Sequence, residues 1–180
     1  MPSPLPLIRL MLGAGLAGAS ALASEPLEVL PDGKARVRIG GLTLYHDPSA
    51  WRIDAADGTY EIRCRGVECD EPMMTVTVAP EADMPCSPGA VIDRSAADYP
   101  HAWTRGVAPA PGPVGLTVHV ATLDQGCRNL AGSPVYACTA HGGRTYWFDA
   151  PGERCHTSLR ETGALLSLLS GLSAVEAEDR

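Results

Sequence analysis

Short stretches in which apolar and polar residues alternate predict a sheet of short antiparallel strands. From Ala35 to Ile39, the apolar residues fall on one face and two arginines on the other, which is typical of a half-buried strand. Similar stretches occupy residues 42–45, 51–54, 60–64, 74–78, 116–120, 135–141 and 144–148. Asp57-Gly58 and Gly142-Gly143 lie between neighbouring stretches and predict two hairpin turns.

The end of the chain carries a helical pattern instead. Ser158 and Glu161 have the spacing of a capping box, and Gly171 is a stop signal. The stripe that follows the cap consists of Leu159, Thr162, Leu165, Leu169 and Leu172. Ser87-Pro88 could open a second, short helix that runs to about Asp98. The proline-rich stretch 107–114 predicts an irregular loop.

These elements predict an α+β domain, because an apolar helix stripe needs a sheet face to cover. We expect an antiparallel sheet of about six or seven strands covered by the C-terminal helix and stapled by disulfides. A β-sandwich is the alternative. The domain would span residues 35–172, with residues 24–34 as a lead-in and residues 173–180 as a flexible, polar tail.

The first 23 residues have the layout of a secretory signal peptide. They contain no acidic residue, carry one cation at Arg9, and end in the small residues around Ala23 after an apolar run from Leu10 to Leu22. That run is too short to cross a bilayer, which needs about 20 apolar residues. We therefore expect cleavage after Ala23, no stable membrane anchor, and a periplasmic or secreted protein.

The charge of the mature chain argues against nucleic acid as a partner. Removal of Arg9 leaves 13 basic and 21 acidic residues, a net charge of about −8, and the arginines are scattered. Tracking of phosphates needs clustered cations.

An even number of cysteines behind an export signal predicts an oxidised framework. The six are Cys64, Cys69, Cys86, Cys127, Cys138 and Cys155. They allow 15 connectivities, among which sequence alone cannot choose. The pairing we favour joins Cys64 to Cys69, Cys127 to Cys138, and Cys86 to Cys155. The last bridge would tie the middle of the chain to the C-terminal helix.

The order of elements resembles that of the photosystem II extrinsic P-subunit superfamily. The residues that carry the likeness are Gly41-Leu-Thr-Leu-Tyr-His-Asp-Pro-Ser-Ala-Trp51 and Tyr146-Trp-Phe-Asp-Ala-Pro151, and it extends over residues 40–172. The resemblance implies a twisted antiparallel sheet covered by helices and an accessory or binding role. It contains no diagnostic motif and transfers no functional residue, and a cysteine framework is not typical of the superfamily.

A metal site is one candidate for chemistry, because imidazole and thioether ligands in an exported chain suit copper. His119 and His141 could project on one side if their strands pair. The other histidines are His46, His101 and His156, and the methionines considered are Met73, Met74 and Met84. No close His or Met cluster occurs, and Met74 alternates like a core residue. We expect no metal and no cofactor.

Thiol chemistry and hydrolysis have little support in the motifs. The closest cysteines, Cys64 and Cys69, are four residues apart and lie beside acidic residues that would raise a thiol pKa. No nucleophile-elbow, Ser-x-x-Lys or zinc-protease motif occurs in the mature chain. The acidic run Glu68, Asp70 and Glu71 could hold Ca²⁺, but a solvated turn is the better interpretation.

A recognition surface is the remaining candidate. Tyr99, His101 and Trp103 cluster beside the proline-rich stretch, and exposed aromatic residues often anchor partners. One of Tyr146 and Trp147 could also be exposed, although the core is the alternative place for all these rings. We expect a non-catalytic binding or accessory protein whose partner is an extracytoplasmic protein or small ligand. A small extracytoplasmic hydrolase, a metal-dependent enzyme and a copper-binding protein are the alternatives.

Overall fold

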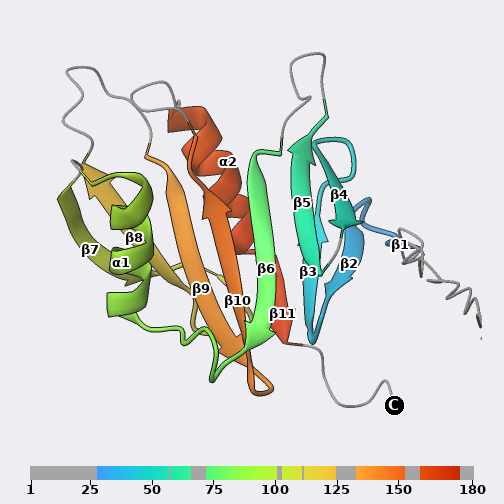
Figure 1. Ribbon diagram of the computed structural model, residues 1–180. Helices are drawn as coiled ribbons and strands as arrows, with labels where there is room; N and C mark the ends of the chain where they lie inside the picture. The colour runs from blue at the N-terminus through green and yellow to red at the C-terminus, as the bar shows by residue number, and fades with distance from the viewer. Residues whose placement is uncertain are drawn as a thin grey trace, which may run out of the picture.

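The computed structural model describes residues 28–56, 58–65, 72–100, 103–110, 112–124, 133–152 and 159–174. The signal peptide predicted for residues 1–23 lies outside them. Two sheets and two helices make up the structure (Figure 1). No helix in the described part of the chain has the length and apolar character needed to cross a bilayer.

The smaller sheet has four strands in the order β1-β2-β3-β11. Their bounds are β1 Glu28–Val29, β2 Ala35–Ile39, β3 Leu42–His46 and β11 Leu172–Ala174. Each pair of neighbours is antiparallel. Beyond β11, Val114 exchanges backbone hydrogen bonds with Leu172 and Ala174, so this short segment lies along the outer edge of β11.

The larger sheet has seven antiparallel strands in the order β4-β5-β6-β10-β9-β8-β7. Their bounds are β4 Trp51–Ala56, β5 Thr59–Cys64, β6 Met74–Pro80, β7 Trp103–Pro109, β8 His119–Asp124, β9 Val135–His141 and β10 Arg144–Ala150. Both predicted hairpins are present, as β4–β5 and β9–β10. The turn of the second is made by Gly142 and Gly143, which both have positive φ, as such turns require.

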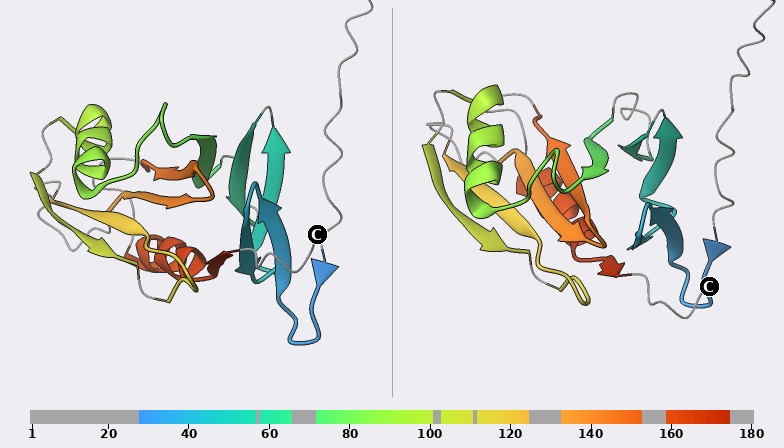
Figure 2. Two further views of the ribbon diagram at one scale, coloured as in Figure 1. Left: turned by 90° about the horizontal axis from the view of Figure 1, so that it is seen from below. Right: turned by 60° about the horizontal axis from the view of Figure 1, so that its bottom comes forward.

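Two helices lie on opposite sides of the β8–β10 part of the sheet (Figure 2). They are α1 Pro88–Asp98 and α2 Leu159–Leu169. Alternation along β10 separates two apolar clusters: Tyr146 and Phe148 belong to the larger one with α2 and the smaller sheet, whereas Trp147 belongs to the smaller one with α1. The antiparallel, largely β architecture with helices is thus as predicted, but the strands form two sheets and not the single sheet that we expected. The structure does not confirm that the C-terminal helix covers the sheet, since the smaller sheet also lines the larger cluster.

Several predicted boundaries were wrong. Residues 107–109 of the proline-rich stretch form the end of edge strand β7, where Pro109 pairs with His119; an edge strand tolerates proline because one side of its backbone needs no ladder partner. The strand expected at residues 116–120 begins at His119 and continues to Asp124.

At the C-terminus, Leu172 lies in β11 and not in the helical stripe. The helix stops as the Gly171 signal indicates. Residues 173 and 174, which we placed in the tail, pair with β3, and residues 28–29 of the lead-in pair with β2. The capping serine, Ser158, lies outside the described residues.

Candidate recognition surface at helix α1

Helix α1 begins where the sequence predicts it. Ser87 has an extended backbone, and its hydroxyl accepts a hydrogen bond from the Ala90 N–H at 3.1 Å. Pro88 opens the first turn, where its missing N–H costs nothing. The inner side of the helix buries Val91 and Ser95 completely. α1 is therefore a capped helix with its inner side packed on the sheet.

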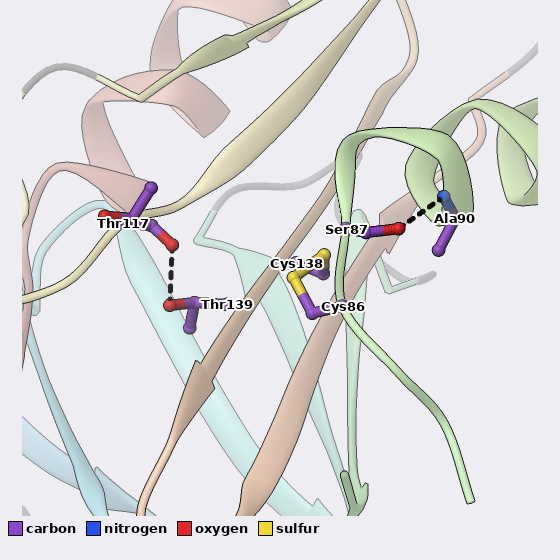
Figure 3. Close-up of a disulfide and its surroundings, with 6 residues drawn as sticks. All are labelled: Cys86, Ser87, Ala90, Thr117, Cys138 and Thr139. Carbon is purple, nitrogen blue, oxygen red and sulfur yellow. Dashed lines mark hydrogen bonds between the residues drawn. A yellow bond between two sulfur atoms is a disulfide. The ribbon is translucent and has the colours of Figure 1, made fainter. Parts of the chain in front are cut away.

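A disulfide joins the start of α1 to the middle of the sheet. Cys86 precedes the cap residue, and its sulfur is bonded to that of Cys138 in β9 (Figure 3). On the following residue, Thr139, the hydroxyl donates to the Thr117 carbonyl at 2.9 Å. Two of the three bridges we favoured were wrong, because Cys86 bonds Cys138, so Cys155 is not the partner of Cys86 and Cys127 is not the partner of Cys138. The direction of the Cys138 side chain explains why it bonds Cys86. Cys138 points to the α1 side of β9, next to the segment that carries Cys86.

The structure describes one of the four remaining cysteines. Cys64 is disulfide-bonded, while Cys69, Cys127 and Cys155 lie outside the described residues. No cysteine in the described part of the chain is free.

An ion pair fastens the middle of α1 to β10. Arg94 Nε donates to one carboxylate oxygen of Asp149 at 2.6 Å, and its Nη2 donates to the other. The guanidinium carbon also lies 5.1 Å from the ring centre of Trp147, within the range of a cation–π contact. The Asp149 hydrogen bonds raise the pKa of Arg94 further above its usual range. This bidentate geometry fixes the rotation of α1 on the sheet.

Two tyrosines fasten the end of α1. The Tyr136 hydroxyl donates to Asp98 at 2.6 Å, and the Tyr99 hydroxyl lies 2.8 Å from the Gly152 carbonyl and also contacts the Pro151 carbonyl. Their rings meet edge to face with centres 6.4 Å apart. Burial raises the pKa of both hydroxyls, and Asp98 raises it further. Both tyrosines are thus held as neutral donors.

The outer side of α1 is exposed, and most of its side chains are small. Gly89, Ile92 and Ala96 lie on it at a spacing of three and four residues, with Asp93 alongside. Ile92 is one of the few large apolar side chains in the described part of the chain that are exposed. This set, which we call the α1 outer stripe, allows another chain to approach the helix closely.

Of the three predicted recognition residues, the structure describes the side chain of Tyr99 only. Tyr99 packs on the sheet with its hydroxyl engaged, and Trp103 is the first residue of β7. His101 and the side chain of Trp103 lie outside what the structure describes. Neither Tyr146 nor Trp147 is exposed, so the core interpretation holds for both.

The two candidate metal ligands do not converge. His119 pairs with Cys138 and thus projects to the α1 side of the sheet, whereas His141, three residues after Cys138, projects to the other side. Across the described residues, no group of three or more His, Cys, Asp or Glu side chains gathers as metal ligands. Glu68, Asp70, Glu71 and His156 lie outside those residues.

Sequence reasoning missed the polar contacts under α1, which involve Arg94, Asp98, Tyr136 and Asp149. One signal was present: Asp149 directly follows the apolar run Tyr146-Trp147-Phe148. A carboxylate in that place needs a cation or a donor. The sequence does not show that Arg94 supplies it from 55 residues away.

Loss of this ion pair should destabilise the fold measurably. We expect Arg94→Met to lower the free energy of unfolding by about 2 kcal/mol, because it leaves a largely buried carboxylate without its partner. In a double-mutant cycle with Asp149→Asn, the two losses should not add. The measurement is urea unfolding. Arg36→Met, in an exposed pair with Glu28, is the control and should change stability by less than about 0.5 kcal/mol; equal losses in Arg94→Met and Arg36→Met would contradict the assignment.

His46 is a buried titratable group at the end of β3. It is 4% exposed, and neither ring nitrogen has a hydrogen-bond partner in the described structure. Burial lowers its pKa below the ordinary value of 6.5; Asp47 partly opposes this, and Arg65 adds to it. His46 is therefore neutral in the folded protein at pH 7.

A folded-state pKa below the unfolded one means that the unfolded chain binds the proton first. The contribution of neutral His46 to the free energy of unfolding should thus be fully present above pH 6.5. It should be lost as the pH falls from 6.5 towards the lowered pKa of His46 in the folded state. Urea unfolding between about pH 5 and 8 measures this loss. His46→Phe should abolish most of it, and the control His141→Gln should keep it. A pH dependence unchanged by His46→Phe would assign the effect to another group.

A scan against protein-family models and a search of curated proteins find no match for this chain. The resemblance to the photosystem II extrinsic superfamily therefore remains a prediction.

Proposed function

We propose that this chain is an exported, non-catalytic binding protein that presents the α1 outer stripe to a partner protein. The observation that carries the proposal is the way α1 is fastened. It is held at its start by the Cys86–Cys138 disulfide, in its middle by Arg94 and Asp149, and at its end by Tyr99. On the same helix, Ile92 is exposed.

Fastening of this kind favours recognition. A helix that is already ordered loses little conformational entropy when it binds, so more of the contact energy appears as affinity. The disulfide also supports the exported location, because such bonds persist in oxidising compartments.

The stripe indicates the class of partner. An apolar residue flanked by glycine and alanine at helical spacing fits an apolar groove, in the manner of helix-in-groove recognition. Asp93 beside the stripe favours a groove with a basic rim. A small polar ligand would need inward-facing polar groups, whereas those under α1 are used to hold the helix.

Co-purification from the cells that produce the protein tests this proposal. The bait is the tagged full chain, as wild type, Ala96→Arg on the stripe, or the control Ala82→Arg in the turn after β6, where the alanine is also exposed. We expect an extracytoplasmic protein to be captured equally by wild type and Ala82→Arg and about tenfold less by Ala96→Arg. Capture of the same proteins by all three baits, or of none, would overturn the proposal.

A further inference from the structure

Strand β4 ends the larger sheet and has one unpaired side in the described structure (Figure 1). The backbone bond from Arg65 N to Ala50 O continues the β4–β5 ladder by one pair. Hydrogen-bonded pairs alternate along an antiparallel ladder, so Arg52 and Asp54 direct their backbone groups at β5. The N–H and C=O groups of Ile53 and Ala55 therefore point away from the sheet.

The bonds of Trp51 confirm this direction. Its N–H donates to Asp47 O, and its carbonyl accepts from Arg65 Nε; neither partner belongs to β5. The outward groups at the start of β4 are thus satisfied locally, and those of Ile53 and Ala55 form the open edge.

Four charged side chains lie on one face of the β4–β5 hairpin. Arg52 is directly opposite Arg63, and Asp54 is directly opposite Glu61. Like charges in direct opposition destabilise a sheet. Here each arginine contacts the acid two residues away on its own strand, at 2.8 Å for Arg52 and Asp54 and at 2.6 Å for Arg63 and Glu61. The two arginines form a positive row across the hairpin, and the two acids form a negative row beside it. Both rows reach the open edge of β4, where Arg52 and Asp54 remain about half exposed.

We propose that β4 is the interface for a second copy of this chain, with the two β4 strands antiparallel and the two-fold axis at Ile53. In this register Arg52 lies opposite Asp54 of the second copy, and Asp54 lies opposite its Arg52. The positive row of one copy continues as the negative row of the other. The two Ile53 residues form a hydrogen-bonded pair through the backbone groups that point outward.

Other two-fold registers lose this match. An axis at Arg52 or at Asp54 places identical charges opposite each other, and an axis at Ala55 places Asp54 opposite Ala56. Charge complementarity therefore selects Ile53. On the opposite face the two Ile53 side chains, which pack against the larger apolar cluster of each copy, would lie side by side and join the two cores.

Sedimentation of the oxidised, full-length mature protein at low salt tests the interface. The variants are Arg52→Asp, Asp54→Arg and the swap R52D/D54R. Each single change places like charges opposite each other twice in the dimer, whereas the swap restores both pairs. We expect wild type and swap to dimerise alike, and each single variant to dimerise at least about tenfold more weakly. Arg144→Asp, an equal charge change at the exposed first residue of β10, is the control and should dimerise like wild type.

Amide exchange gives a second measurement that needs no variant. The Ile53 N–H should exchange more slowly as the wild-type concentration is raised, and circular dichroism should show that all variants are folded. A wild type that stays monomeric over a roughly hundredfold range of concentration, or a folded swap that dimerises no better than the single variants, would overturn the proposal. Because the α1 outer stripe is not part of this edge, failure here leaves the proposed partner binding untouched.

Discussion

Removal of the Cys86–Cys138 disulfide is expected to lower the free energy of unfolding by about 4 kcal/mol. The double variant C86S/C138A removes the bond without leaving a free thiol. The bridge closes a loop of 52 residues, and the chain-entropy cost that it removes from the unfolded state grows with the logarithm of that length. Serine suits the partly exposed position 86 and alanine the fully buried position 138. Urea unfolding under oxidising conditions measures the change.

The loss should be far larger than that from removing the neighbouring cap. Ser87→Ala deletes only the hydrogen bond to Ala90, so it should cost about 1 kcal/mol. If C86S/C138A unfolded at the same urea concentration as wild type, the bridge could not be what anchors α1.

Gly171→Ala should cost about 3 kcal/mol, for a steric reason. A Cβ at this position would lie 2.2 Å from the backbone oxygen of Tyr45 and 3.2 Å from that of Leu168. Neither atom is the end of a flexible side chain. The Gly171 carbonyl also accepts the Tyr45 N–H at 3.0 Å, so the turn between α2 and β11 must approach β3 closely. Thermal or urea unfolding of the variant measures the loss.

Gly163→Ala is the matched control. Gly163 lies inside α2 and is exposed, and beyond the backbone of its own helix no atom lies within 4 Å of an added Cβ. Since alanine is the better helix former, this change should stabilise the protein by about 0.5–1 kcal/mol. Opposite signs for the two substitutions would support the close approach at Gly171, whereas similar small effects would contradict it.

The sequence predicted best where local rules and tertiary packing agree. The β9–β10 hairpin carries its own glycine turn, and α1 carries its own cap, so both formed where expected. Predictions failed where distant partners decide the outcome. Pro109 suggested a loop because nothing local shows that it pairs with His119 at a sheet edge. Leu172 fits both a helix stripe and a strand, and its pairing with Leu44 of β3 decides between them.

The candidate site was less predictable than the fold. Tyr99 stood out as an aromatic residue, yet its role depends on Pro151 and Gly152, more than 50 residues later in the chain. The sequence alone does not single out Arg94, and only β10 gives it Asp149 and Trp147. The disulfide partner of Cys86 depends on which face of β9 meets α1, a property of the assembled sheet.

Disulfide mapping by mass spectrometry, on protein purified natively from the extracytoplasmic fraction, tests most directly how α1 is held. We expect a cross-linked peptide pair that contains Cys86 and Cys138, in a chain that begins after Ala23. Reduced thiols at these two positions, or a bond from either of them to another cysteine, would contradict the fastening of α1 on which the proposed function rests.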